Sequence, residues 1–411
     1  MNIENYIRQM KEIQNAILEC IDDESFNEEN NKKLNNLLEE QSIKDKPNEL
    51  KSILYILSKI ANNHNRATNF FSKIERILKI FKEEMKEYFT NPEIFNIFKG
   101  NKRILLYLIK ENIIIINKSV INKLRQKNYI YYFYPEIDQI DSEIFDRKYI
   151  KKIIEDSFDI YEEKRKIGEN DSYLCELIRN NSIDEFIQYL NENKRSLTSI
   201  IEPSIFETNS FLINKKISLI EYSAFFGSIK IIHFLLSNKI ELNSSLLLFA
   251  IHSQNLELIQ NIEQQISKQN DNFYEECLIE SIKCHHNKIT DYFLNKFVKK
   301  NEIECLKYYN FNYFNMNFID KSIFHNLCKY DYSFIIKNLF DSSEFDLDLN
   351  EKIFQRKIRI ESNEKEMEII EYEKTALLVS VEKGNIQVVN LLLSHKDIDV
   401  NVKSECKHFY F

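Results

Sequence analysis

Apolar residues recur every three or four positions through the first part of the chain, which is the spacing of one face of an α-helix. The clearest runs lie at residues 3–18, 50–60 and 70–81. Another helix is expected to begin at Asn91-Pro92, with Asn91 as its cap and Pro92 in its first turn. The pattern predicts a helical domain over residues 1–165.

From about Ser172 a different pattern begins, in which a block of ten residues recurs. The block starts with Ser or Thr, mixes small and apolar residues, and in its best copies ends in glycine. These copies are residues 218–227 (SLIEYSAFFG) and 375–384 (TALLVSVEKG). Glycine after a short helix accepts the left-handed conformation that ends a helix at little cost. A second apolar helix and an Asp- or Asn-containing turn follow each block. The pattern therefore predicts helix pairs, which must stack because one pair cannot bury its apolar faces alone.

Weaker copies of the block align on the position of that final glycine. The six aligned positions are 181, 227, 254, 285, 331 and 384, of which only 227 and 384 hold glycine. Their spacing varies from 27 to 53 residues, so we expect insertions at residues 191–216, 297–320 and 351–373. The prediction is one stacked α-solenoid of five or six helix pairs over residues 172–401.

This block resembles the ankyrin repeat, whose signature includes T-P-L-H-x-A with a period of about 33 residues. The order of the chain is also similar to a set of protist proteins in which a helical domain of unknown function precedes ankyrin repeats. The resembling stretches include YYFYPEI, GENDSYL, IFETN and YEECLIESIKCHH, at residues 131–137, 168–174, 205–209 and 274–286. The resemblance implies an all-α fold, with an N-terminal helical domain at residues 1–165 and an irregular, ankyrin-like α-solenoid at residues 166–411. That family has no assigned catalytic activity.

The composition of the chain narrows the possible fold classes, partners and cellular compartments. The 411 residues include 4 Gly and 4 Pro, where average usage would give about 29 and 20. So few turn residues disfavour a sandwich, a barrel or a glycine-loop nucleotide fold. The net charge of −8 argues against a nucleic-acid partner, which needs a basic face. With no signal peptide, no apolar run near the roughly 18 residues of a membrane span and 7 cysteines expected to be reduced, we expect a protein of the cytosol or nucleoplasm that does not engage a membrane.

Two groups of residues suggest chemistry. Cys277, Cys284, His285 and His286 offer zinc ligands, but their spacing along a predicted helix does not match a zinc site, and repeat packing is the favoured interpretation. His325 occupies the histidine position of the signature, where the resemblance implies a hydrogen bond to backbone near the repeat turn. Pairing with Cys328 as a nucleophile is the alternative, but nothing nearby supplies an oxyanion hole. We expect no metal, no cofactor and no catalysis.

In the ankyrin architecture, the two residues before the glycine position face the concave surface. The resemblance therefore gives as partner-binding candidates Phe225, Phe226, His252, Ser253, Lys329, Tyr330, Glu382 and Lys383. An exposed aromatic pair at Phe225-Phe226 would anchor a partner. In the alternative, one or both pack under the adjoining insertion or repeat.

The expected function is that of a scaffold that binds a protein partner on its concave surface. The alternative is an adaptor or regulatory subunit that recruits an enzyme such as a ubiquitin ligase or a kinase. An enzyme hidden in residues 1–165 is least favoured, because that region lacks glycine loops and holds only His64 and Cys20 among its histidines and cysteines.

Residues 402–411 show no helical period, so we expect the C-terminal end to fray. In the alternative, residues 409–411 fold back as a cap on the last helix pair.

Overall fold

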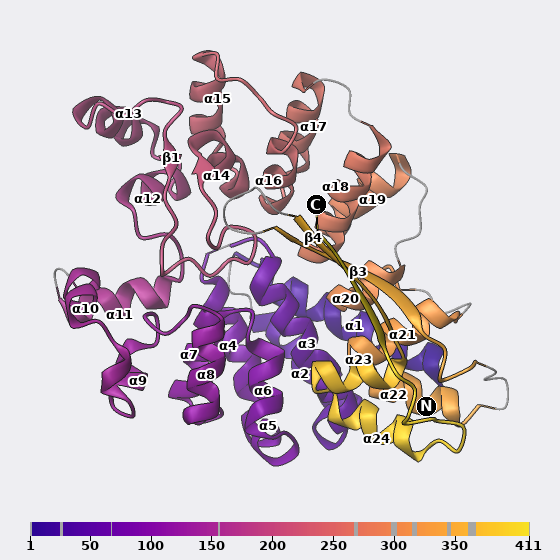
Figure 1. Cartoon of the computed structure of the whole chain (residues 1–411). Helices are drawn as coiled ribbons and strands as arrows, with labels where there is room; N and C mark the ends of the chain where they lie inside the picture. The colour runs from indigo at the N-terminus through magenta and orange to yellow at the C-terminus, as the bar shows by residue number, and fades with distance from the viewer. Residues whose placement is uncertain are drawn as a thin grey trace. The chain divides into compact units, whose positions relative to one another are not determined.

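The computed structural model describes residues 2–24, 28–66, 68–154, 157–266, 270–296, 302–314, 319–342, 347–360 and 367–410. Within these residues lie 24 α-helices and five strands (Figure 1). The expected all-α solenoid fold is confirmed. No helix in these ranges is long and apolar enough to cross a membrane.

The chain divides into two compact units. Unit 1 comprises residues 1–15, 45–53 and 300–411, and unit 2 comprises residues 16–44 and 54–299. Each unit therefore combines residues from before and after position 165. The division into an N-terminal helical domain at residues 1–165 and a repeat region at residues 166–411 stays a prediction from the sequence.

Of the first eleven helices, α1 and α3 are divided between the two units and the other nine belong to unit 2. Those before residue 100 are α1 (Ile3–Asp22), α2 (Glu28–Glu40), α3 (Pro47–Asn63), α4 (Phe70–Ile80), α5 (Lys82–Tyr88) and α6 (Asn91–Phe98). Those after it are α7 (Lys102–Lys110), α8 (Lys118–Gln126), α9 (Tyr134–Asp138), α10 (Arg147–Ile153) and α11 (Phe158–Ile167). The three apolar runs of the sequence correspond to α1, α3 and α4, and most of the residues that defined them are buried.

The predicted start of the helix at Asn91 is confirmed, but its cap is Thr90 rather than Asn91. The backbone N–H and the hydroxyl of Thr90 both donate to Glu93 Oε2, at 2.9 and 2.7 Å. A Thr followed three residues later by Glu is the sequence signature of this capping box.

Unit 2 continues with four helix pairs. They are α12 (Tyr173–Arg179) with α13 (Ile183–Glu192), α14 (Leu219–Phe226) with α15 (Ile229–Ser237), α16 (Leu246–His252) with α17 (Leu256–Gln265), and α18 (Asp271–Cys284) with α19 (Asn287–Lys296). The first, inner helices stack in the order α12, α14, α16 and α18. The second, outer helices lie against their own partners, and α13 also packs on α15.

Unit 1 holds α20 (Glu302–Tyr308) and two further pairs, α21 (Lys321–Lys329) with α22 (Ser333–Phe340) and α23 (Ala376–Lys383) with α24 (Ile386–Ser394). Inner helix α21 packs on both α20 and α23. The start of α1 completes this core, since the Tyr6 ring stacks on Phe334 with centroids 4.4 Å apart. Gln14 donates to Asn310 Oδ1 at 3.1 Å and accepts from the Phe311 N–H at 2.8 Å.

All six aligned glycine positions adopt the left-handed conformation, whether or not they hold glycine. Their φ angles are 52° at Asn181, 65° at Gly227, 59° at Gln254, 58° at His285, 67° at Asp331 and 73° at Gly384. Each follows the end of an inner helix. Against the prediction of five or six helix pairs, the described residues contain six at these positions, four in unit 2 and two in unit 1.

Strands form where the sequence suggested insertions or a frayed end. In unit 2, β1 (Ile200–Ile201) pairs with β2 (Ile217–Ser218). In unit 1, β3 (Ile353–Ile360), β4 (Met367–Lys374) and β5 (Glu405–Tyr410) form an antiparallel sheet in the order β3-β4-β5.

The expectation of a frayed C-terminal end is wrong, because β5 pairs with β4 from Glu405↔Glu373 to Tyr410↔Glu368. The segment folds back, but onto the hairpin of the third insertion. The segment cannot form an amphipathic helix, but the unpaired N–H and C=O groups along the edge of β4 offer hydrogen bonds that order it as a strand.

Candidate protein-interaction surface

The candidate binding residues lie where the inner helices end. In unit 2, these ends carry Phe225-Phe226 on α14, His252-Ser253 at α16 and Lys283-Cys284 on α18. Phe226, Ser253 and Lys283 are partly exposed. Because the left-handed residue that follows turns the chain back toward the outer helix, the preceding side chains gather at one end of the stack.

Phe225 and His252 are not available to a partner, because they are 2% and 1% exposed. Phe211, from the insertion at residues 191–216, packs over both. Its ring centroid lies 4.4 Å from that of His252 and 6.2 Å from that of Phe225, and the Phe225 and His252 rings stack at 4.5 Å. The alternative interpretation, an aromatic residue covered by the adjoining insertion, is confirmed for Phe225.

A buried polar network joins α16 to α18 beneath this surface. His252 Nε2 lies 2.8 Å from Glu280 Oε1, and Lys283 Nζ lies 2.8 Å from the same oxygen. Burial lowers the pKa of His252, so the neutral ring donates from Nε2. Burial alone would raise the pKa of Glu280, but the hydrogen bond from His252 and the charge of Lys283 lower it to about 2. The carboxylate stays ionised and holds two neighbouring repeats together.

The same network contains the one group of three possible metal ligands in the described ranges, His252, Glu280 and Cys284, whose donor atoms lie within 4.8 Å of one another. Cys284 Sγ is 3.5 Å from His252 Nδ1. Burial raises the pKa of the Cys284 thiol well above its ordinary value, so a zinc ion would have to displace both the thiol proton and Lys283. The geometry favours a hydrogen-bonded ion pair. The set foreseen from sequence, with Cys277, His285 and His286, does not converge.

Sequence reasoning missed His64, which belongs to this part of unit 2. Its Nδ1 lies 2.7 Å from the carbonyl oxygen of Cys284, and its Nε2 lies 2.8 Å from Asp22 Oδ1. The His286 ring lies 4.7 Å from the His64 ring, and burial keeps the pKa of His286 well below its ordinary value. No local signal relates His64 to a residue 220 positions away, so only the fold brings them together.

In unit 1, His325 behaves as the resemblance implied. It is 4% exposed, and its Nε2 lies 3.0 Å from the carbonyl oxygen of Glu351. Burial lowers the pKa of His325 and raises the pKa of the Cys328 thiol. A nucleophilic thiol needs its thiolate form, which this environment disfavours.

The unit 1 candidates are more accessible than those of unit 2. Lys329 and Tyr330 are half-buried at the end of α21, and Glu382 and Lys383 are exposed at the end of α23. Glu382 is engaged in an ion pair with Lys374 of β4.

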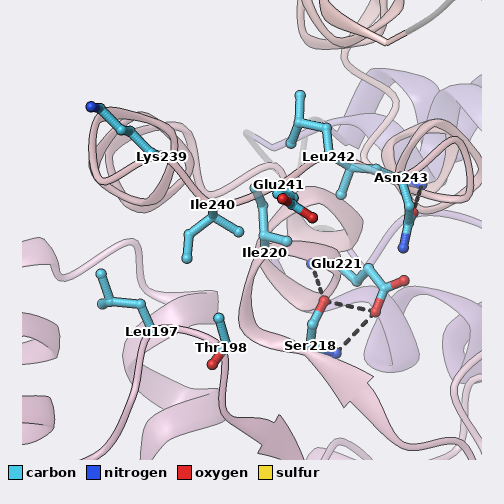
Figure 2. Close-up of a pocket in the computed structure, with 11 residues that line it drawn as sticks. Leu197, Thr198, Ser218, Ile220, Glu221, Lys239, Ile240, Glu241, Leu242 and Asn243 are labelled. Atoms are coloured by element: carbon cyan, nitrogen blue, oxygen red, sulfur yellow. Dashed lines mark hydrogen bonds between the residues drawn. The ribbon is translucent and has the colours of Figure 1, made fainter.

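Two hollows lie elsewhere in unit 2. The first, whose lining residues are drawn in Figure 2, lies between the segment at Leu197 and the turn at residues 239–243. Its volume is about 310 Å³. Among its lining residues, Ser218 donates from its N–H and its hydroxyl to Glu221 Oε2, at 2.9 and 2.7 Å, in the capping box that begins α14. A second hollow of about 370 Å³ lies between α15 and α17. Neither brings together groups that suggest a reaction.

Comparison with known proteins agrees with this geometry over part of the chain. Residues 372–405 match the family model of the ankyrin repeat. The match spans the end of β4, the pair α23–α24 and the start of β5, and includes the left-handed Gly384. Neither the comparison with curated proteins nor that with solved structures finds a significant match. Ankyrin repeats mediate protein–protein interactions, and this repeat supports such a role for the chain.

Proposed function

We propose that this chain is a non-catalytic scaffold that binds a protein partner along the ends of its inner helices, the surface that is concave in ankyrin arrays. The observation that carries the proposal is the recurrence of one backbone device, an inner helix ended by a left-handed residue, at six positions. One of these six copies is the ankyrin match at residues 372–405. Rigid stacked repeats bind by shape and by a few anchor residues.

The residues proposed to contact the partner are the exposed members of the predicted set, together with Lys283. They are Phe226, Ser253 and Lys283 in unit 2, and Lys329, Tyr330, Glu382 and Lys383 in unit 1. Phe225 and His252 support this surface from below. A half-exposed aromatic residue such as Phe226 combines contact area with little loss of side-chain entropy, which suits an anchor.

The absence of catalysis is part of the proposal. The six cysteines whose side chains are described, Cys20, Cys175, Cys277, Cys284, Cys305 and Cys328, are all buried, and burial raises their thiol pKa values. The buried histidines His64, His252, His286 and His325 bond to backbone carbonyls or carboxylates and line neither of the two hollows described above. These groups stabilise the repeats.

The proposal is tested by affinity capture from the cells that express the protein, with partners identified by mass spectrometry. The bait variants are Phe226→Ala combined with Ser253→Glu, and a control with the same change in net charge, Lys230→Ala on outer helix α15, where the lysine is exposed. We expect a partner that the control retains and the surface variant loses. Equal recovery with both baits would contradict binding at the inner-helix ends.

The alternative function, an adaptor that recruits an enzyme, predicts a different result in the same experiment. The captured proteins would then include a ubiquitin ligase or a kinase in constant stoichiometry with the chain. The surface variant would lose both that enzyme and the enzyme's substrate.

A further inference from the structure

Three lysines occupy the last turns of three neighbouring helices in unit 1. Lys307 lies on α20, Lys329 on α21 and Lys383 on α23, and α21 packs on both of the other helices. A cation at a helix C-terminus interacts favourably with the helix dipole. That interaction explains why any one of these helices has a lysine in its last turn. It does not explain why three lysines lie together at adjacent helix ends. We call these residues the lysine patch.

The charges of the lysine patch are only partly neutralised. Lys307 Nζ lies 2.9 Å from Glu304 Oε2. In the part of the chain that the structure describes, no carboxylate lies within 4.0 Å of the ammonium group of Lys329 or of Lys383. Burial lowers the pKa of Lys329, and repulsion from Lys383 and Lys307 lowers it further. The three helix ends are adjacent, since the Tyr309 hydroxyl donates to the Tyr330 carbonyl and the Asn385 side chain donates to the Lys329 carbonyl. Repulsion among like charges at adjacent helix ends costs free energy that a bound anion would recover.

Two tyrosines give the patch flat apolar surfaces beside its charges. Lys329 Nζ lies 5.3 Å from the ring centroid of Tyr330, and Lys307 Nζ lies 4.8 Å from that of Tyr308. Tyr330 is half-buried. An Asp or Glu side chain whose carboxylate pairs with the lysines would therefore place its methylene groups against the aromatic rings. Interface cores combine aromatic contacts and charge pairs in this way.

We propose that the lysine patch binds an acidic segment of the protein partner, with Asp or Glu carboxylates paired to Lys329 and Lys383. This inference rests on the proposed scaffold function and names the chemistry of its partner. Charges farther than the Debye length of about 8 Å are largely screened at physiological ionic strength. A short segment therefore responds to the local positive charge rather than to the net charge of −8.

Nucleic acid is the less suitable polyanion. Its affinity comes from many phosphate contacts, typically about 6–10, whereas the patch offers three lysines, one of them already paired. The remainder of a long phosphate backbone would lie along a chain with an excess of acidic residues.

The test measures the fluorescence anisotropy of labelled octaglutamate titrated with the full chain at low and at physiological ionic strength. We expect saturable binding that weakens with salt. Lys329→Glu with Lys383→Glu should lower the affinity about tenfold or more, since it removes two attractions and adds two repulsions. Lys337→Glu with Lys288→Glu changes the net charge equally at exposed positions of outer helices α22 and α19, and should leave the affinity within about twofold.

Loss of folding could also explain weaker octaglutamate binding, so a variant that is expected to bind more tightly serves as a second test. Glu304→Gln frees Lys307 from its ion pair, so it should tighten octaglutamate binding by about two- to threefold. Far-ultraviolet circular dichroism of each variant checks the helical content.

The proposal is overturned if the two double variants weaken octaglutamate equally, or if Glu304→Gln has no effect. It is also overturned if labelled oligothymidylate binds through Lys329 and Lys383 while octaglutamate does not, which would assign the patch to nucleic acid. Sedimentation showing a dimer that Lys329→Glu with Lys383→Glu dissociates would assign it to a second copy of this chain. Because octaglutamate binding is measured on the purified chain, its failure is separate from failure to capture a partner at Phe226.

Discussion

At the scale of single residues, the left-handed positions decide how each inner helix ends. Four of the six hold Asn, Gln, His or Asp in place of Gly. A non-glycine residue in this conformation costs about 1–2 kcal/mol, which Asn and Asp reduce through local hydrogen bonds. The alignment of the repeats identified all six positions, because an apolar helix precedes and follows each of them even where the glycine is absent.

Of the two glycines among the six left-handed positions, Gly227 is the one at which a side chain is expected to be more harmful. Its φ is 65°, and a Cβ atom there would lie 3.2 Å from the Cβ of Ser253 on the next repeat. Gly227→Val should therefore lower the free energy of unfolding by roughly 1–3 kcal/mol, as measured by chemical denaturation.

The matched control is Gln254→Gly, at an exposed left-handed residue. It should raise the free energy of unfolding by about 1 kcal/mol, since it relieves the strained conformation. An unchanged midpoint for Gly227→Val would show that this helix end does not need the left-handed conformation.

The raised pKa of Glu169 predicts how the stability of unit 2 depends on pH. Burial and the nearby charge of Glu207 raise the pKa of Glu169 to about 8, although Arg66 and Arg179 oppose the shift. The folded state then keeps a proton that the unfolded state releases above its ordinary pKa of about 4.3. The contribution is fully favourable below that value and is lost as the pH rises through about 8.

We therefore expect the wild-type denaturation midpoint to fall between about pH 6 and pH 9. Glu169→Gln cannot ionise, so its midpoint should fall less over the same interval. Equal slopes for the two proteins would contradict the raised pKa of Glu169.

At the scale of elements, the insertions determine which surfaces of the repeats stay open. The insertion at residues 191–216 places Phe211 over Phe225 and His252, and so closes part of the predicted binding surface. The third insertion forms the hairpin β3–β4, which presents an edge to β5. The runs IFQRKIRI and MEIIEYEK contain branched and aromatic residues at frequent positions, a composition that favours strands and that could have suggested the hairpin.

The pairing of β5 with β4 predicts slow hydrogen exchange at the C-terminal end. Amides of residues 405–410 that bond to β4 should be protected relative to those of residues 402–404, which belong to no strand. Hydrogen–deuterium exchange followed by mass spectrometry measures this difference. Equally fast exchange in both segments would restore the expectation of a frayed end.

At the scale of the whole molecule, residues of the N-terminal helices pack against repeat residues within each unit. In unit 1, Lys51 Nζ lies 2.7 Å from Asp331 Oδ2, and both side chains are 4% exposed. The pair joins α3 to the left-handed residue after α21. In unit 2, His64 makes the equivalent long-range connection to α18.

Lys51→Met is expected to lower the free energy of unfolding by about 3–5 kcal/mol, because it removes the cation that neutralises a buried carboxylate. The double variant Lys51→Met with Asp331→Asn should recover much of this loss, since asparagine carries no charge and also tolerates the left-handed conformation. Chemical denaturation of the single and double variants measures the coupling. Additive losses would contradict a direct ion pair.

The sequence by itself determined the features that repeat over short distances. The helical period identified α1, α3 and α4, and the ten-residue block identified six helix pairs and their left-handed ends, because helix propensity and helix termination depend on neighbouring residues. It also placed the candidate binding residues at the inner-helix ends.

Only the tertiary structure decided which of those residues stay exposed, and which distant residues meet. Phe211 covers Phe225, His64 reaches Cys284, and the lysines of α20, α21 and α23 come together across insertions of irregular length. Each of these contacts joins residues that no periodic pattern relates, since burial and charge proximity depend on how whole helices pack rather than on spacing along the chain.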